Sequence, residues 1–374
     1  MGIQTVIRAA LFSAALFVSA AAGAMKIERI GPALAHPWGM DFLDHDTVLV
    51  TLRGGGLMRI ALDDGETTVI SGLPEVYNRR QGGMLDVAAA DGQIYLCYSA
   101  ILDGRSSTAI DRAVLVENAL IRRQTIFIGN NPTRSGHHFG CRLQVAGEIV
   151  YASLGDRGTR NIAQDPAAHA GSLIRINRDG SIPDTNPDKA GWAPEIFTIG
   201  HRNPQGMAMH PRTGDIWTHE HGPRGGDEIN IISPDRDGGA NYGWPTVSHG
   251  REYATGLRVS KHDSLPGYVD PAWVWIPSIA PSGMAFYPDA ADGNDAAVMF
   301  PEFKGNLLVG SLKFRRLYLV KLDGNTGLPR SEHIILDGQI GRIRDVAVAT
   351  HGPHAGAILL LSDEEKGGLY MMKQ

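Results

Sequence analysis

The chain has 374 residues, of which 43% are hydrophobic and 20% are charged, and its formal net charge is −5. This balance is typical of a soluble globular protein, and the absence of a basic stripe argues against a nucleic-acid partner. The 46 glycines and 21 prolines favour many turns over long helices.

The first 24 residues are predicted to be a secretory signal peptide. Arg8 supplies a positive charge, residues 9–22 form a short apolar run, and Ala22-Gly23-Ala24 fits a cleavage site. The run is short for a membrane anchor, and no later segment is long and apolar enough for a stable membrane span. We therefore expect a mature chain that begins near Met25 and is periplasmic or secreted.

A two-strand unit recurs six times in the rest of the chain. Its first strand is predicted at residues 39–42, 84–87, 142–145, 206–209, 283–286 and 344–348. Its second strand is predicted at residues 48–52, 94–98, 149–154, 216–219, 307–312 and 358–361. Spacings of roughly 45 to 80 residues leave room for two more strands in each unit, such as residues 57–62, 113–120 and 317–322.

Six four-stranded units at this spacing predict an all-β fold, namely a six-bladed β-propeller with antiparallel blades. Because the self-similarity is weak, five or seven blades remain alternatives. Residues 25–374 show no linker and are predicted to form a single domain. The two cysteines, Cys97 and Cys141, either pair in an exported protein or stay as two buried thiols.

The predicted fold brings polar strand ends together at one mouth of the propeller. In a propeller, the loop before each first strand and the loop after each second strand open on the same face. The polar residues before first strands are Gln81, His138, Arg202, Asn203, Gln205, Ser282, Arg342 and Arg344. Those after second strands are Asp156, the segment 221–223, Lys313 and Asp363. Spacing alone therefore predicts a site there.

Four of these residues, Arg202, Lys313, Arg342 and Arg344, are cations. They would repel one another in one mouth unless an anion lay between them, and arginines suit a planar ligand with several carboxylates. The alternative is that each arginine pairs with a local acid, as Arg344 could with its neighbour Asp345.

His138 is the candidate base, because an imidazole titrates near neutral pH. Asp156, one strand pair further on, could orient the ring and favour its charged form. The alternative is that His138 is an ordinary hydrogen-bonded histidine at the start of a strand, without a catalytic role.

Oxygen donors gather just after the fourth unit's second strand. Gly222 and Pro223 offer backbone carbonyls at a tight turn, and Glu228 and the Tyr242 carbonyl follow. Ligands that are all oxygen favour Ca²⁺ over Zn²⁺. The alternative is an ordinary Gly-Pro turn followed by an exposed acid.

Seven segments together resemble the soluble pyrroloquinoline-quinone-dependent aldose sugar dehydrogenases of the glucose/sorbosone dehydrogenase family. They occur in order between about Gln81 and Asp363 and cover most of the chain after the leader. The longest are Gly200-His201-Arg202-Asn203-Pro204-Gln205-Gly206, residues 220–230, Asn241-Tyr242-Gly243-Trp244-Pro245 and residues 277–284; the shorter ones are residues 155–158, 311–313 and 342–346.

The resemblance implies a six-bladed propeller that binds pyrroloquinoline quinone and Ca²⁺. The residues implied to hold the quinone are Arg202, Asn203, Lys313, Arg342 and Arg344. One calcium would bridge the cofactor to the carbonyls of Gly222 and Pro223. A second, structural calcium would take Glu228 and the Tyr242 carbonyl.

The resemblance also implies a reaction. His138, supported by Asp156, would take the proton from the anomeric hydroxyl of an aldose while hydride passes to the quinone, which yields a lactone. Arg202 would stabilise negative charge on the quinone oxygen, and Gln81 would contact the sugar.

Two departures from the glucose-specific members imply a broader aldose range. His137 precedes the base where those members carry an acid, and the chain lacks their long inserted loops. Two other interpretations stay open, a calcium-dependent lactonase-type propeller hydrolase and a non-catalytic sugar- or protein-binding propeller. The sequence does not indicate which molecule accepts the electrons.

Overall fold

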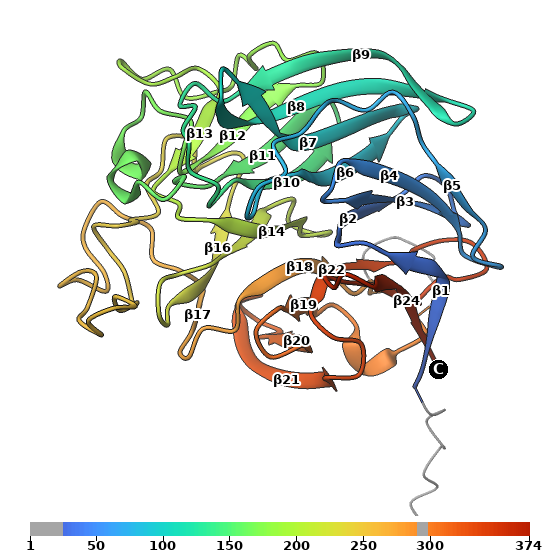
Figure 1. Cartoon of the computed structure of the whole chain (residues 1–374). Coiled ribbons are helices and arrows are strands. Elements are labelled where there is room, and N and C mark those ends of the chain that lie inside the picture. Colours follow the sequence, from blue (N-terminus) through green and yellow to red (C-terminus); the bar gives the residue numbers. More distant parts are fainter. Residues whose placement is uncertain (1–24, 290–297) are drawn as a thin grey trace, which may run out of the picture.

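The computed structural model describes residues 25–289 and 298–374 and contains six four-stranded antiparallel sheets. The six sheets stand around one centre, toward which the first strand of each sheet converges (Figure 1). The predicted all-β, six-bladed propeller is therefore confirmed, and five or seven blades are excluded. In the described part of the chain, no helix has the length and apolar character that crossing a membrane requires. The expected signal peptide lies outside the described residues.

The blades follow one another along the chain. The strands of the first three blades are β2 Pro37–Phe42, β3 Thr47–Leu52, β4 Gly56–Ala61 and β5 Thr67–Val69; β6 Met84–Ala90, β7 Gln93–Leu102, β8 Arg105–Val116 and β9 Ala119–Ile128; and β10 Gly140–Ala146, β11 Ile149–Leu154, β12 Ser172–Asn177 and β13 Ile196–Ile199.

The next two blades have the same order from the axis outward. Their strands are β14 Pro204–Met209, β15 Ile216–Glu220, β16 Asp227–Ile232 and β17 Trp273–Trp275, then β18 Pro281–Phe286, β19 Leu307–Ser311, β20 Arg316–Leu322 and β21 Pro329–Asp337.

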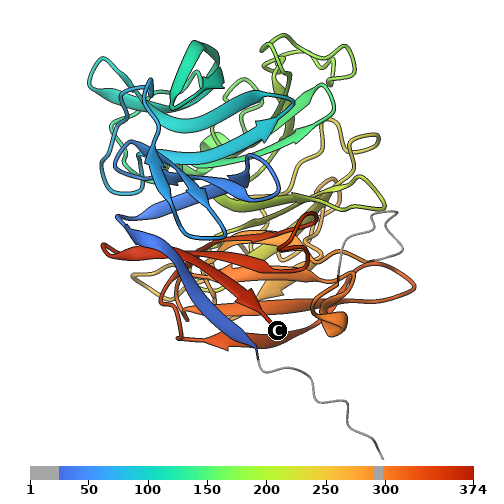
Figure 2. The same ribbon diagram turned by 90° about the vertical axis from the view of Figure 1, so that its right-hand side faces the viewer.

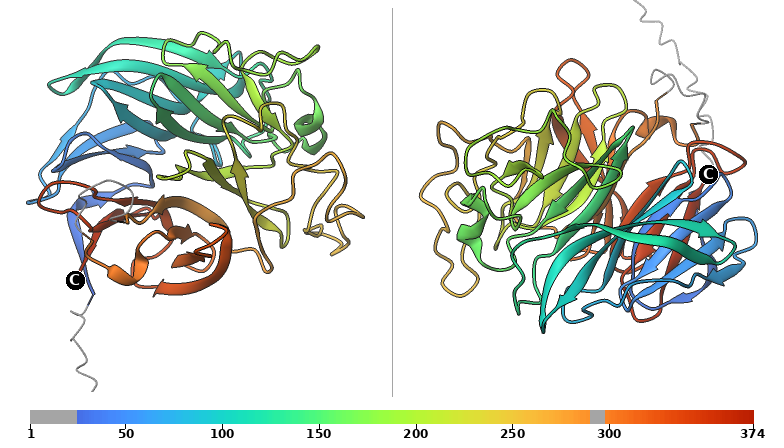
Figure 3. Two further views of the ribbon diagram at one scale, coloured as in Figure 1. Left: turned by 180° about the vertical axis from the view of Figure 1, so that it is seen from behind. Right: turned by 90° about the horizontal axis from the view of Figure 1, so that it is seen from above.

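The sixth blade joins the two ends of the described chain. It contains β22 Ile343–Val348, β23 Ile358–Ser362 and β24 Gly367–Lys373, and its outer strand is β1 Lys26–Leu34. Strand β1 runs antiparallel beside β24, with Lys26 opposite Lys373 (Figures 2 and 3). This pairing within the sixth blade ties the start of the described chain to its end by backbone hydrogen bonds and so closes the ring.

The structure corrects one predicted strand and decides between the two alternatives for the cysteines. Residues 113–120 are not one strand, because the chain reverses at Glu117 and Asn118 between β8 and β9. The two cysteines form a disulfide between β7 and β10, which joins the second and third blades. Both are fully buried, so the bond ties blade to blade within the core.

Every innermost strand carries a register irregularity near its start. The irregularities fall between residues 37 and 40, 84 and 86, 140 and 143, 204 and 206, 281 and 284, and 343 and 345. A bulge places an extra residue opposite its partner strand and re-aims the side chains beside it. Four of the six irregularities contain a polar residue, namely Arg142, Gln205, Ser282 and Arg344.

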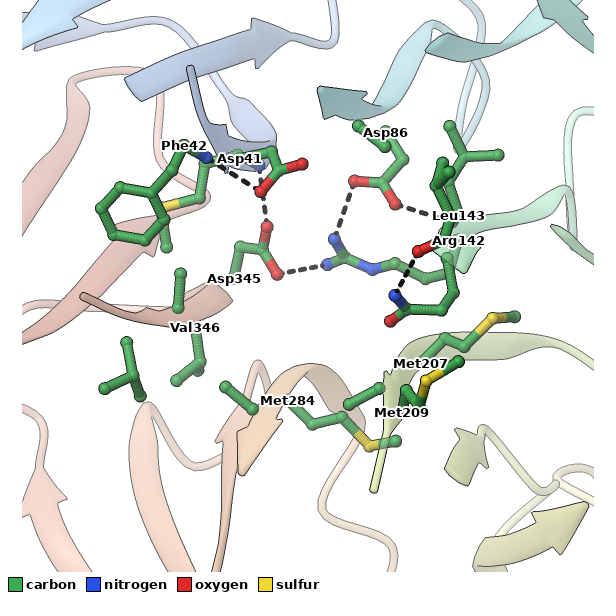
Figure 4. Close-up of a pocket in the computed structure, with 18 of the residues that line it drawn as sticks. Asp41, Phe42, Asp86, Arg142, Leu143, Met207, Met209, Met284, Asp345 and Val346 are labelled. Atoms are coloured by element: carbon green, nitrogen blue, oxygen red, sulfur yellow. Dashed lines mark hydrogen bonds and ion pairs between the residues drawn. The ribbon is translucent and has the colours of Figure 1, made fainter. Parts of the chain in front are cut away.

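Arg142 lies buried on the axis and divides the central channel. Its guanidinium pairs with Asp86 at 3.1 Å and with Asp345 at 2.9 Å, and it lies 4.4 Å from the centre of the Trp38 ring. On one side is a cavity of about 380 Å³ with methionine side chains and the carboxylates of this network in its walls (Figure 4). Burial, only partly offset by Arg142, raises the pKa of Asp86 to about 7. The other side is the mouth that the sequence singles out.

Candidate active site

A cavity of about 510 Å³ occupies this mouth, where the innermost strands begin. It brings together most of the predicted cofactor and substrate residues. Its polar lining consists of Arg53, Gln81, Asn203, Gln205, His221, Lys313, Arg342, Arg344 and Asp363. Four of these side chains are cations and one is a carboxylate, and burial lowers the pKa of His221 to about 3, so that ring is neutral. The cavity is therefore strongly positive.

The single carboxylate, Asp363, serves several of the cations. It is 2.9 Å from Arg344 and 3.7 Å from Arg342. Burial raises the pKa of Asp363, but the nearby Arg344 charge outweighs it and holds that pKa well below its usual range. Arg344 does not pair with its neighbour Asp345, which binds Arg142 instead, so the local-pair alternative is wrong for this arginine.

Arg344 lines the cavity and has a buried donor without a partner. Its side chain is 8% exposed, its Nη1 donates to Gln205 Oε1, and its Nε has no partner in the described structure. A buried guanidinium N–H without an acceptor is costly. Together with the cation excess, it shows that the residues present suit an anionic ligand with oxygen acceptors.

His138 and Asp156 form a close pair that is not part of the lining of this cavity but lies next to its residues Gln81 and Phe139. The distance from His138 Nδ1 to Asp156 Oδ1 is 2.6 Å, and Asp156 is 1% exposed. Burial raises the pKa of Asp156, but the hydrogen bond and charge of His138 outweigh it, so the pKa lies below its ordinary value. A Cβ on Gly155 would stand 2.3 Å from the His138 carbonyl oxygen, so only glycine allows the two segments to approach.

The backbone of His138 is held in an uncommon conformation, with a φ of 51°. Its N–H donates to Gln81 Oε1 at 2.7 Å, and Gln81 lines the cavity. Left-handed backbone at a non-glycine residue clusters at functional sites, where surrounding contacts maintain it. The contact also places the predicted base directly beside the predicted sugar-contacting residue.

Arg202 lies outside the large cavity, unlike the other three predicted cations. Its Nη1 donates to the carbonyl oxygens of His221 and Gly222 at 2.7 and 2.8 Å. Its guanidinium lies 5.2 Å from the centre of the Trp244 ring. The predicted quinone contact of Arg202 would therefore come from its other guanidinium nitrogens or from a rotated head group.

The predicted metal-binding oxygens cluster around a smaller hollow. Gly222, Pro223 and Glu228 line a space of about 10 Å³ together with Arg202 and Trp244. The Gly222 carbonyl already accepts a hydrogen bond from the positively charged Arg202 side chain. A metal ion would place a positive charge next to the same oxygen. No cluster of three or more His, Cys, Asp or Glu side chains suited to a metal occurs in residues 25–289 and 298–374, so any ion here depends on carbonyl ligands.

Glu228 is an acid in an acidic setting. It stands opposite Glu220 on the neighbouring strand. Burial first, and then the charges of Glu220 and Asp227, raise the pKa of Glu228 well above its ordinary value. A bound cation would relieve both effects, so this residue suits a calcium ligand. Tyr242 has its ring in the core, stacked on His201 at 4.9 Å, and it enters neither hollow's lining.

Three aromatic or charged residues at or near the mouth had no predicted role. Trp38 and Arg53 line the large cavity, and Trp244 donates from Nε1 to Asp156 Oδ2 at 2.8 Å. Arg53 follows the second strand of the first unit directly, which is the same repeat position that points to Lys313 and Asp363. Trp244 does not occupy one of the repeat positions, and its role at the site is seen only from its hydrogen bond to Asp156.

The fold and the mouth define a class of protein: a six-bladed propeller with a cation-rich cavity for an anionic ligand and a histidine–aspartate pair beside it. A family model for glucose/sorbosone dehydrogenases matches residues 34–371, and the chain belongs to that family. It is 37% identical to an aldose sugar dehydrogenase of Escherichia coli over 365 residues, covering 94% of this chain and 93% of the relative. It is 25% identical to quinoprotein glucose dehydrogenase B of Acinetobacter calcoaceticus over 412 residues, covering 87% and 82%.

Solved structures agree. The apo-form of the soluble aldose sugar dehydrogenase of Escherichia coli superposes with a TM-score of 0.84 at 36% identity, covering 93% of this chain and 99% of that one. The PQQ-bound aldose sugar dehydrogenase of Streptomyces coelicolor has a TM-score of 0.74 at 24% identity, covering 93% and 98%, and shares the fold.

Proposed function

We propose that the protein is a quinoprotein oxidoreductase that oxidises aldose sugars at the anomeric carbon to lactones, with pyrroloquinoline quinone and Ca²⁺ as cofactors. The observation that carries this is the cavity itself, in which four cations face one carboxylate and Arg344 Nε has no acceptor. Pyrroloquinoline quinone is a planar tricarboxylate and matches this charge. The named activities of the relatives support the same reaction.

The predicted cofactor-binding residues would contact different parts of the cofactors according to their positions. Lys313, Arg342 and Arg344 would bind the carboxylates, and Asn203 would hydrogen-bond the ring system from the cavity wall. The carbonyls of Gly222 and Pro223 would ligate the catalytic calcium, and Glu228 with the Tyr242 carbonyl would ligate the structural one. When bound, the quinone supplies the carbon that accepts hydride from the sugar's anomeric C–H.

The protein's own residues handle the proton. With Nδ1 engaged by Asp156, the Nε2 of a neutral His138 ring is the nitrogen free to accept the proton of the anomeric hydroxyl. Asp156 then faces a positively charged ring and stabilises it. Gln81, fixed against the His138 backbone, would orient the sugar, and Arg202 would stabilise charge that develops on the acceptor side. Export through the predicted signal peptide would place the reaction outside the cytoplasm.

The test is a reconstitution assay with the purified protein that begins at Met25. Pyrroloquinoline quinone and Ca²⁺ are added singly and together, and reduction of an artificial acceptor is followed with a panel of aldoses. We expect turnover only with both additions, and loss of turnover when a chelator removes calcium. Absence of sugar-dependent reduction with both additions, together with hydrolysis of a lactone panel, would replace this proposal with the hydrolase.

A further inference from the structure

The carboxylate of Asp156 is held at both oxygens. Oδ1 accepts from the Gly158 backbone N–H at 2.8 Å and contacts His138 Nδ1. Oδ2 accepts from Trp244 Nε1 at 2.8 Å, across 88 residues of sequence, and that bond is buried. A carboxylate turns about its terminal torsion with little resistance. The Gly158 N–H holds Oδ1 and the indole N–H holds Oδ2, so the two donors together fix the direction in which Oδ1 faces.

Trp244 is itself anchored on several sides. Its backbone N–H donates to the Gly200 carbonyl at 3.0 Å, and its carbonyl accepts from Gln164 Nε2 at 2.7 Å. The ring is 7% exposed, and the guanidinium carbons of Arg202 and Arg160 lie 5.2 and 5.7 Å from its centre. A cation over an indole face is favourable, so one ring contacts both the support of the base and the predicted charge-stabilising arginine.

We propose that Trp244 is a positioning residue that locks the Asp156 carboxylate so that His138 keeps its proton on Nδ1 and its Nε2 free. The inference rests on the proposed function for its catalytic consequence. The physical reason is twofold. Together with the Gly158 N–H, the indole N–H prevents the carboxylate from turning, and by donating to Oδ2 it lowers the affinity of the carboxylate for a proton, so that the proton stays with the imidazole.

The first variant is Trp244→Phe, which keeps an aromatic ring next to Arg202 and removes the N–H donor together with part of the ring volume, a loss of volume that the control shares. Trp275→Phe is the matched control, because Trp275 Nε1 also donates to a carboxylate, that of Glu332, from a buried ring. We expect Trp244→Phe to lower kcat about tenfold or more, the effect of one hydrogen bond to a charged group. KM and quinone affinity should stay within about twofold, and the control should match the parent.

The decisive readout is independent of catalysis. Ring ¹⁵N shifts of His138 in the cofactor-free protein, at about pH 9, report the tautomer of the neutral ring. We expect the Nδ1–H form to dominate in the parent and in Trp275→Phe, and a mixture of both tautomers in Trp244→Phe. An unchanged tautomer in Trp244→Phe, or equal loss of kcat in both variants, would overturn the inference.

A second measurement applies even if Trp244→Phe does not fold. In the parent, the indole N–H signal of Trp244 should be shifted downfield by its carboxylate acceptor and should move on Asp156→Asn, whereas the Trp275 signal should not. A Trp244 signal that ignores Asp156→Asn overturns the inference. If the parent fails to oxidise sugars, the proposed function fails, while these NMR results still decide whether Trp244 orients the pair.

Discussion

Replacing Arg344 with methionine tests the anion site most directly. Methionine keeps much of the buried volume and removes the charge, including the Nε donor that has no partner. The lining then falls from four cations to three against the one carboxylate of Asp363. Two charges about 4 Å apart interact by about 4 kcal/mol at an effective dielectric of about 20.

Part of that gain is offset when the guanidinium and the ligand lose water. Truncating one partner of a buried charged contact usually costs about 2 kcal/mol or more, so we expect Arg344→Met to weaken binding of pyrroloquinoline quinone by about 30- to 150-fold. The assay is isothermal titration calorimetry of the apo-protein with the quinone at fixed calcium. Arg330→Met is the control, because Arg330 is 75% exposed and pairs with Asp323, just beyond the end of β20 that lies away from the mouth.

A double variant separates net charge from direct contact. Arg344→Met with Asp363→Asn has three cations and no carboxylate in the lining, which is the same net charge as the parent. If only the field of the cavity matters, this double variant recovers the parent affinity. If Arg344 contacts the ligand, it stays weak. Parent-like affinity in the single variant would refute the reasoning and place the anion elsewhere.

Three further predictions follow from other parts of the molecule. His138→Gln should lower kcat by about 10²- to 10⁴-fold, as expected for a general base, while calorimetry shows unchanged quinone affinity; parent-like turnover would contradict the assignment. Replacing Cys97 and Cys141 with alanine should lower the free energy of unfolding by about 4 kcal/mol, because the disulfide spans 44 residues; an unchanged denaturant midpoint would show that the bond contributes nothing. Burial, and then the charge of Arg142, lowers the pKa of His219 to about 3. Between about pH 6.5 and pH 3 the unfolded chain therefore binds a proton that the folded chain does not. As the pH drops through this range, the free energy of unfolding falls by about 1.4 kcal/mol per pH unit. His219→Gln should reduce the slope by this amount in denaturant unfolding at about pH 6, 5 and 4, while His221, whose pKa is also lowered to about 3, keeps its own contribution; an equal slope in both proteins would refute it.

The repeat in the sequence predicted the fold because each blade is built the same way. A period-2 strand next to the axis and a second strand behind it are local patterns, and the propeller carries their ends to one mouth. The residues predicted from those ends, such as Gln81, Lys313 and Arg342, do line one cavity. Arg53 obeys the same rule in the first blade, although the prediction did not include it.

Pairing within the ionic network could not be predicted in this way. A strict period-2 pattern places Arg344 and Asp345 on opposite faces of their strand, but it does not say which distant partner each finds. The bulge between residues 343 and 345 interrupts the pattern at that point. Arg344 then reaches Asp363 just after the next strand, β23, while Asp345 reaches Arg142 three blades away. Such choices depend on three-dimensional distances at the axis, which one strand's sequence does not contain.

The proposed base, anion cavity and metal loop are linked by short polar contacts at the junction of the third and fourth blades. The Asp156 backbone N–H donates to the Arg202 carbonyl at 2.8 Å, and the His221 N–H donates to the Asn203 carbonyl at 3.2 Å. Asn203 also accepts from the Gly140 N–H and lines the cavity. A shift of one blade against the other would therefore displace all three parts together. This explains why the polar motif at residues 200–206 is dense at one strand entry, because it contacts three neighbouring sites at once.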